Sequence, residues 1–487
     1  MVRRVYLLAS VVLMLTPAGA AQAQSPTPLT PEAGPLDVAV NWRSRAEVWD
    51  WFEGNTGNSD YGFGHSQLRV SIGQKRSKVD WFVEGEAITV FALPSDAVAP
   101  APLGQLGHGA TYYAANGSEN NASGFLKQAY LHLKQLGQTN LKVGRFEFFD
   151  GAEARSSEPL VETIVNQRVA NRLISNFAFT AVQRSFDGAQ FQWNAGAHNF
   201  TAFGGRPTEG VFQVNAMKEV DVQSYYGAYN TSVKTTNGGG ALRVFGVGYI
   251  DTRSTVLKVD NRPQAARAAD TGDIKIGTWG ANYVHVFHTK ESGAFDVIGW
   301  GALQTGQWGN LTQRAGAFVA ELGWQAQSTP LKPWISGGYS YGTGDKDPHD
   351  GTHGTFFQLL PTPRQYARFP FYNMMNNKDV YATFNFRPIP KLAVRSEVHD
   401  LHLADAADLW YLGGGAFQQS TFGFQGRPSN GHTDLSTVAD VSADYPLTRY
   451  LNLTLYYAHA TGGLVVSAIY PKSPDGQLSY VEATVHF

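Results

Sequence analysis

Long segments of two-residue alternation recur along this chain and limit the folds that it can adopt. From Val38 to Val48, apolar residues alternate with polar and charged ones, and the pattern returns in residues 67–72, 80–87 and 128–134. Alternate residues of a β-strand point to opposite faces, so each segment predicts a strand with one apolar and one polar face. Several segments approach or exceed the 9–11 residues that a tilted strand needs to cross a bilayer. Soluble sandwiches and propellers, whose strands average about 5–6 residues, fit this pattern less well.

The spacing of these segments favours a closed barrel. We count about eighteen candidate strands, an even number as in bacterial single-chain barrels. Short connections such as 73–78 and 388–390 alternate with long ones such as 94–123 and 342–377. Short turns on one rim and long loops on the other are typical of outer-membrane proteins. The predicted fold class is all-β, a transmembrane antiparallel β-barrel of about 18 strands with long extracellular loops.

The last segment, 478–487, keeps the alternation up to its final residue. Val481, Val485 and Phe487 share one parity, while Glu482 and His486 lie on the other. A strand that ends on an apolar residue is stable if neighbouring strands pair with both of its edges, as the last strand of a barrel requires. We therefore expect this segment to close the barrel.

The composition excludes several other classes of protein. The chain has no cysteine, so a disulfide-stapled domain and a cysteine nucleophile or metal ligand are ruled out. Only 16% of the residues are charged, whereas 13% are aromatic and 52 are glycine, which suits strands that face lipid. The formal net charge of -2 gives no reason to expect a nucleic-acid partner.

The N-terminal residues predict export. Arg3 and Arg4 precede an apolar run from Val5 to Leu15, and small residues lead to Ala23. This is the pattern of a secretory signal peptide, and the run is shorter than the roughly 20 residues of a membrane-spanning helix. We expect a signal peptide at 1–23, a Pro-rich leader at 24–35 and the barrel at 36–487. The expected location is the outer membrane of a Gram-negative-type bacterium.

The polar parity of the strands predicts what the lumen carries. If the apolar face contacts lipid, charged side chains on the other face point inward, and Arg43, Arg45 and Arg69 are among them. A lumen with many charges holds water, which indicates a channel or a plugged pore.

A second charged stretch lies in the middle of the chain. It contains Val143-Gly144-Arg145-Phe146-Glu147, then Gly151 and Arg155, and later Arg184-Ser185-Phe186-Asp187-Gly188. A Gly- and Asp-rich loop at 342–351 precedes Phe356. In this order, on a barrel pattern, these motifs resemble the core signature of the alginate export family of outer-membrane proteins. The chain departs from the family pattern by a long segment between Arg155 and Arg184, which holds Arg168 and Arg172.

The resemblance implies a monomeric barrel whose lumen narrows at an arginine-rich constriction and passes anionic polysaccharide. By these motifs, Arg145, Arg155 and Arg184 correspond to the arginines of the family's constriction, and Glu147 and Asp187 correspond to the acids beside them. Guanidinium groups stay charged and bind carboxylates in bidentate geometry, which suits a polymer of uronate sugars. With Arg43, Arg45 and Arg69 from the alternation, these residues form the predicted substrate-binding and selectivity set.

The sequence thus predicts a channel that passes an anionic polysaccharide or oligosaccharide, or small anions, and not an enzyme. We expect no catalytic residue, no metal and no cofactor. The expected partners are an anionic saccharide or a small polar solute, outer-membrane lipid and lipopolysaccharide, and a periplasmic export partner. A general diffusion porin without a preferred solute, a barrel plugged by its loops and an outer-membrane hydrolase are the alternatives.

Overall fold

The computed structural model of the protein describes residues 34–290, 293–326, 328–362 and 368–487. The predicted signal peptide and residues 24–33 of the predicted leader lie outside the described residues. The first strand begins at Leu36.

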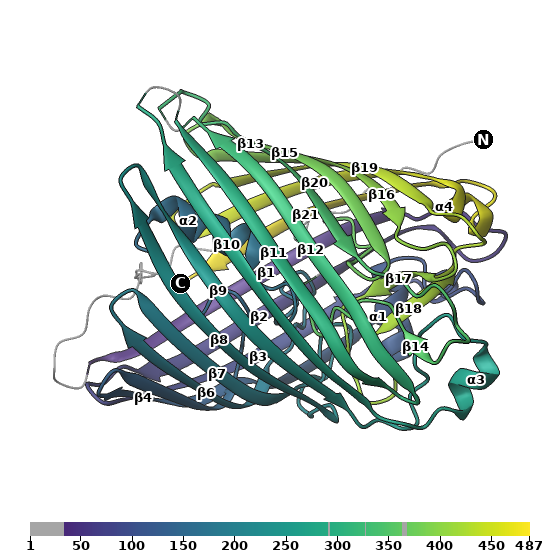
Figure 1. The fold of residues 1–487 in the computed structure, drawn as a ribbon, viewed down its shortest axis with the longest axis horizontal. Coiled ribbons are helices and arrows are strands. Elements are labelled where there is room, and N and C mark those ends of the chain that lie inside the picture. Colours follow the sequence, from purple (N-terminus) through teal and green to yellow (C-terminus); the bar gives the residue numbers. More distant parts are fainter. Residues whose placement is uncertain (1–33, 291–292, 327, 363–367) are drawn as a thin grey trace.

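One antiparallel sheet closes into a barrel, as Figure 1 shows. Eighteen long strands form this sheet. They are β1 (Leu36–Asp50), β2 (Asp60–Gln74), β3 (Val79–Phe91), β4 (Asn121–Leu136), β5 (Thr139–Phe146), β6 (Phe186–Ala195), β7 (His198–Pro207), β8 (Val222–Thr235), β9 (Gly238–Asp251), β10 (Ile274–His288), β11 (Ala294–Trp308), β12 (Leu311–Gln325), β13 (Trp334–Gly342), β15 (Asn377–Ile389), β16 (Leu392–Leu403), β19 (Asp434–Pro446), β20 (Leu451–Gly462) and β21 (Asp475–His486). The predicted fold class is confirmed.

The last strand closes the barrel, as its alternation predicted. β21 pairs with β20 on one edge and with β1 on the other. The pairing begins at Asn41 opposite His486, and beside it the backbone N–H of Val40 donates to the carbonyl of Phe487 at 3.0 Å. Closure gives each of the described wall strands a neighbour on both sides, so the wall has no open edge that could pair with another chain.

The two rims of the barrel differ as predicted. Short turns join β2 to β3, β4 to β5, β6 to β7 and β8 to β9 at one rim, and the long connections lie at the other. The long connections carry η1 (Ser95–Ala97), α1 (His108–Asn116), α2 (Pro159–Ile164), the π-helical turn η2 (Val165–Val169), α3 (Gln264–Ala269), β14 (Thr352–His353), β17 (Leu409–Gly413), β18 (Phe424–Pro428) and α4 (Leu464–Ile469). Among the described residues, no helix combines the length and the apolar character that a membrane span needs.

The two faces of the wall carry the residues that the alternation assigned to them. On the outside, Leu131 is 52% exposed and Leu322 is 68% exposed. On the inside, charged side chains such as Arg45, Glu86 and Glu321 are buried. Apolar side chains on the outside can contact lipid, whereas the inward charges are covered by chain segments that fold into the lumen.

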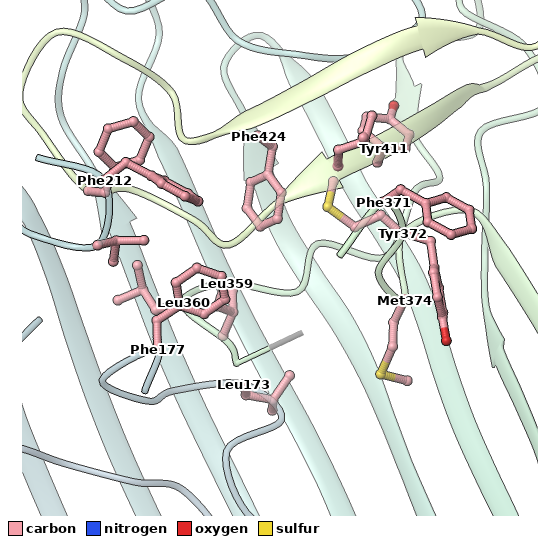
Figure 2. Packing of buried hydrophobic residues seen from close by; sticks show 14 of the residues in the cluster. Leu173, Phe177, Phe212, Leu359, Leu360, Phe371, Tyr372, Met374, Tyr411 and Phe424 are labelled. Atoms are coloured by element: carbon pink, nitrogen blue, oxygen red, sulfur yellow. The ribbon is translucent and has the colours of Figure 1, made fainter. Parts of the chain in front are cut away.

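The main hydrophobic core lies inside the barrel. Leu173 and Phe177, from the connection between β5 and β6, pack near Leu359 and Leu360, from the connection between β13 and β15 (Figure 2). A short parallel bridge joins Ile174 to Leu360. Burial of these apolar groups contributes on the order of 1.5–3 kcal/mol for each large side chain, so the two connections stabilise each other within the lumen.

The lipid-facing side of β12 allows a direct test of this orientation. Phe318 lies near the middle of the strand and is 44% exposed, whereas Thr312 lies on the same face near the long-connection rim. We expect Phe318→Arg to lower the free energy of unfolding in phospholipid vesicles by about 2–4 kcal/mol, because a cation at the bilayer midplane loses its hydration. Thr312→Arg should cost about 0–1 kcal/mol. Equal losses in a denaturant titration would show that Phe318 does not face lipid.

Candidate functional site

The connection between β5 and β6, residues 147–185, folds into the lumen and is held there by the wall. Donors from β1, β2 and β4 bind five consecutive backbone carbonyls of this connection. Arg43 donates to Ala178 and Thr180, Arg45 to Phe179, Gln67 to Ala181 and Lys127 to Val182, at no more than 3.1 Å. The carbonyls of an irregular segment have no strand partner, so these donors supply the hydrogen bonds that burial requires.

Acidic side chains neutralise the same cations. Arg45 donates through Nε to Glu482 at 2.8 Å and also pairs with Glu47. Arg69 donates to Glu86 at 2.9 Å and to Glu147 at 3.2 Å. The structure therefore brings the predicted Arg43, Arg45 and Arg69 together with Glu147, but these arginines are occupied in holding residues 147–185 in place.

A second anchor lies deeper in the same connection, on η2. The Arg168 guanidinium donates to Glu321 of β12 at 2.8 Å and to Glu397 of β16 at 2.9 Å. Tyr381 donates to the same Glu321 carboxylate at 2.9 Å, and Arg395 also pairs with Glu397. The ion pairs are buried, so removal of one partner leaves an uncompensated charge in a medium that solvates it poorly.

The predicted residue Arg184 is fully buried beside the loop between β17 and β18. Its guanidinium donates to the carbonyls of Gly414 at 2.6 Å and Ala416 at 3.2 Å. Burial lowers the pKa of Arg184 to about 9, so the side chain stays charged at neutral pH. Arg184 thus links the connection between β5 and β6 to the connection between β16 and β19.

The predicted pair Arg145 and Asp187 lies on the outer face of the wall. The guanidinium donates twice to the carboxylate, at 2.7 and 2.6 Å. Arg145 shares its parity with Val143, which is 46% exposed, and Asp187 shares its parity with Phe191, which is 38% exposed. The pair therefore lies apart from the lumen, where the family resemblance implied a constriction.

Two cavities flank α2 and η2 at the short-turn side of the lumen. The first, the basic cavity, has a volume of about 610 Å³. Its charged lining residues are Arg168, Lys332, Arg368, Arg387, Arg395 and Asp444. Five cations against one acid give this cavity a positive potential, which attracts anions.

The second cavity, the amide cavity, has a volume of about 320 Å³. The predicted residue Arg155 lines it and is exposed. Its other polar lining residues include Arg243, Glu153, Glu162, Asn194, Asn199, Asn230 and Asn282. α2 contacts β9 and β10 on this side (Figure 1). Residues 159–169 contribute to both cavities, so α2 and η2 divide this part of the lumen.

Two long connections also meet at a pair of buried acids, Asp345 and Asp408. The Asp408 carboxylate accepts hydrogen bonds from the Asp345 backbone N–H at 2.9 Å, Thr355 at 2.6 Å and Tyr411 at 2.7 Å. Burial and the neighbouring Asp408 raise the pKa of Asp345 to about 7. Burial raises the pKa of Asp408 to about 6. The contact between the two connections is thus sensitive to pH near neutrality.

The sequence could have indicated some of the residues outside the predicted set. Arg243 and Arg395 lie on the inward parity of their strands, so the alternation marked them as lumen residues. Lys332 lies in a short turn and Arg368 in a long connection, where no alternation exists to assign a direction.

A comparison with protein families decides the identity of the barrel. The family model described as alginate export matches residues 109–473. The chain belongs to the alginate export family. No curated protein matches the chain.

Solved structures show the same fold. Acinetobacter baumannii OccAB2 has a TM-score of 0.58 at 10% identity, covering 93% of this chain and 98% of that one. Pseudomonas aeruginosa OccK9 (OpdG) has a TM-score of 0.56 at 10% identity, with the same coverage. Pseudomonas aeruginosa OpdK, solved with vanillate, has a TM-score of 0.54 at 9% identity over 93% and 98% of the two chains. This member of the alginate export family is an outer-membrane channel barrel of a Gram-negative bacterium, with its short turns on the periplasmic side.

The buried anchor on η2 yields one prediction. Arg168→Met leaves Glu321 and Glu397 without their shared guanidinium. We therefore expect the free energy that holds residues 147–185 against the wall to fall by about 3–5 kcal/mol. Backbone amides of this connection should then exchange hydrogen faster. Arg206→Met is the matched control, because Arg206 also faces two acids but its side chain is 45% exposed, and such a pair contributes about 0–1 kcal/mol. Equal exchange in the two variants would contradict the anchor.

The acid pair yields a prediction about pH. The folded chain binds the Asp345 proton more tightly than the unfolded chain, so this contact is most stable in acid and weakens as the pH rises from about 4 to about 7. We expect hydrogen exchange at 343–350, corrected for its intrinsic rate, to be faster at pH 8 than at pH 5. Asp345→Asn should reduce this dependence. Asp347→Asn, an exposed acid in the same loop, should leave it unchanged, and equal effects would refute the assignment.

Proposed function

We propose that the protein is a monomeric channel that moves anionic solutes, including uronate oligosaccharides and small anions, across the outer membrane without chemical change. The observation that supports this most directly is the charge of the basic cavity. Lys332 and Arg387 line it, and neither has an acidic partner within four ångströms among the described residues. Unlike the arginines that hold residues 147–185, these two cations remain free to attract a solute.

The other groups around the basic cavity are consistent with weak binding followed by release. Arg168 and Arg395 share Glu397, so their positive charge is partly compensated. Asp444 lines the same space. A conducting site must attract the ion without holding it, and acids beside the cations limit the affinity. We propose that anions pass Lys332 and Arg387 at the periplasmic side.

The predicted selectivity residues take separate parts in this proposal. Arg155 is exposed at the amide cavity, where it can meet a carboxylate on the solute. Arg43, Arg45, Arg69 and Arg184, with Glu147, hold the connections that shape the lumen. A polymer needs a wider passage than a small anion, so export of a long uronate chain would require residues 147–185 to leave their anchors.

Selectivity can be tested with two double variants that remove the same charge at the same rim. Lys332→Gln with Arg387→Gln removes the free cations of the cavity. Lys391→Gln with Arg449→Gln removes cations from neighbouring short turns that do not line it. In planar bilayers under a salt gradient, we expect the first pair to reduce the anion-to-cation permeability ratio about two- to ten-fold and the second pair to leave it nearly unchanged.

Block by an oligouronate added on one side of the bilayer completes this test. We expect trigalacturonate to reduce the current through the natural protein. The same concentration should reduce the current through the Lys332→Gln, Arg387→Gln double variant by a smaller fraction. A large, unselective current that trigalacturonate does not block would instead identify a general diffusion porin.

A further inference from the structure

A third cavity lies at the extracellular rim, far along the barrel from the short turns. It has a volume of about 200 Å³ and we call it the ring cavity, because aromatic side chains line it. These are Trp51, His108, Phe212, Phe417, Phe422 and Phe424. They come from separate connections, and Figure 2 shows Phe212 and Phe424 on different segments. Distant parts of the chain thus build one site.

Polar side chains interrupt this aromatic lining and have no partners of their own. The side-chain amides of Gln105, Gln418 and Gln425 line the ring cavity and make no hydrogen bond within the part of the chain that the structure describes. Gln418 is only 7% exposed, and the Thr421 hydroxyl is buried without a partner. The buried Thr421 hydroxyl costs about 1–3 kcal/mol while it lacks a partner, and the three amides are open to a molecule in the cavity. This arrangement points to a ligand that supplies hydrogen bonds.

The charge of the ring cavity differs from that of the basic cavity. Among the described residues that line it there is no Asp, Glu, Lys or Arg, and His108 is the sole titratable side chain. Arg253 and Arg427 lie behind the lining, and their guanidinium groups already donate to backbone carbonyls there. A charged ligand would therefore lose its hydration without gaining a free counter-charge. The ring cavity therefore favours an uncharged ligand, in contrast to the periplasmic side of the same lumen.

We propose that the ring cavity binds a single uncharged pyranose ring, either a free sugar or one residue of a neutral glycan. The apolar C–H face of such a ring can pack on an aromatic side chain, while its hydroxyl groups donate to and accept from the amides of Gln418 and Gln425. Sites for drug-sized ligands have volumes of about 300–1,000 Å³, so the smaller ring cavity accommodates about one ring. A purely aromatic ligand would leave the amides unpaired.

This assignment does not depend on the proposed anion selectivity. The ring cavity and the basic cavity share no lining residue, and they lie near opposite rims. Loss of anion selectivity would therefore leave the sugar site intact, and loss of sugar binding would leave anion selectivity intact.

The test is saturation-transfer NMR on the full chain, refolded in a detergent that contains no sugar. The probes are methyl α-D-glucopyranoside as the neutral sugar, methyl α-D-glucopyranosiduronate as its charged counterpart and phenol as an aromatic ring. We expect transfer to the ring protons of the glucoside, and weaker transfer to the other two probes. Stronger transfer to phenol or to the glucosiduronate, or no transfer to the glucoside, would overturn the proposal.

Matched variants locate the binding. Gln418→Leu with Gln425→Leu should raise the dissociation constant of the glucoside about ten-fold or more, because two hydrogen-bonding amides are lost. Gln307→Leu is the control, since Gln307 is an exposed amide on the outer face of β11. Thr421→Val provides a milder change if the double variant does not refold, and it should weaken binding in the same direction. Unchanged affinity in the folded Gln or Thr variants would place the sugar elsewhere.

Discussion

The capture of five consecutive carbonyls, at residues 178–182, by side chains of the barrel wall is the interaction on which the interior depends. A segment without regular structure cannot be buried unless its backbone groups find partners. Arg43, Arg45, Gln67 and Lys127 supply those partners from strands that are themselves fixed by the closed sheet. Once this connection is fixed, its apolar residues can pack against the connection between β13 and β15, and the remaining space becomes separate cavities.

The same chemistry explains why a charged lumen need not be a selective one. A guanidinium that already donates to carbonyls and acids has few donors left for a passing solute. Most lumen arginines of this member of the alginate export family are engaged in that way. Lys332 lies in the turn between β12 and β13, and Arg387 lies near the end of β15. They differ from those arginines because no acid among the described residues lies within ion-pair distance of either. On the proposed mechanism, selectivity depends on which cations remain unpaired more than on how many are present.

The alternation predicted the barrel, its closure and the inward direction of Arg43, Arg45 and Arg69, because a period of two fixes the face of every strand residue. The same rule places Arg145 outward, two residues after the lipid-facing Val143, whereas the family motif had suggested a constriction residue there. Direction could not be predicted for Arg184, Lys332 or Arg368, since connections have no period. Their contacts depend on how distant segments meet, as in the bonds from Arg184 to Gly414 and Ala416.

The position of α2 and η2 between the basic cavity and the amide cavity has an electrical consequence. On the proposed function, the two cavities are passages on either side of this partition and act as conductors in parallel, so their conductances add and the wider one carries most of the current. A side chain that narrows one passage then reduces the total only in part. Because the two passages differ in charge, the ion preference of the whole barrel is an average of the two, weighted by the current through each.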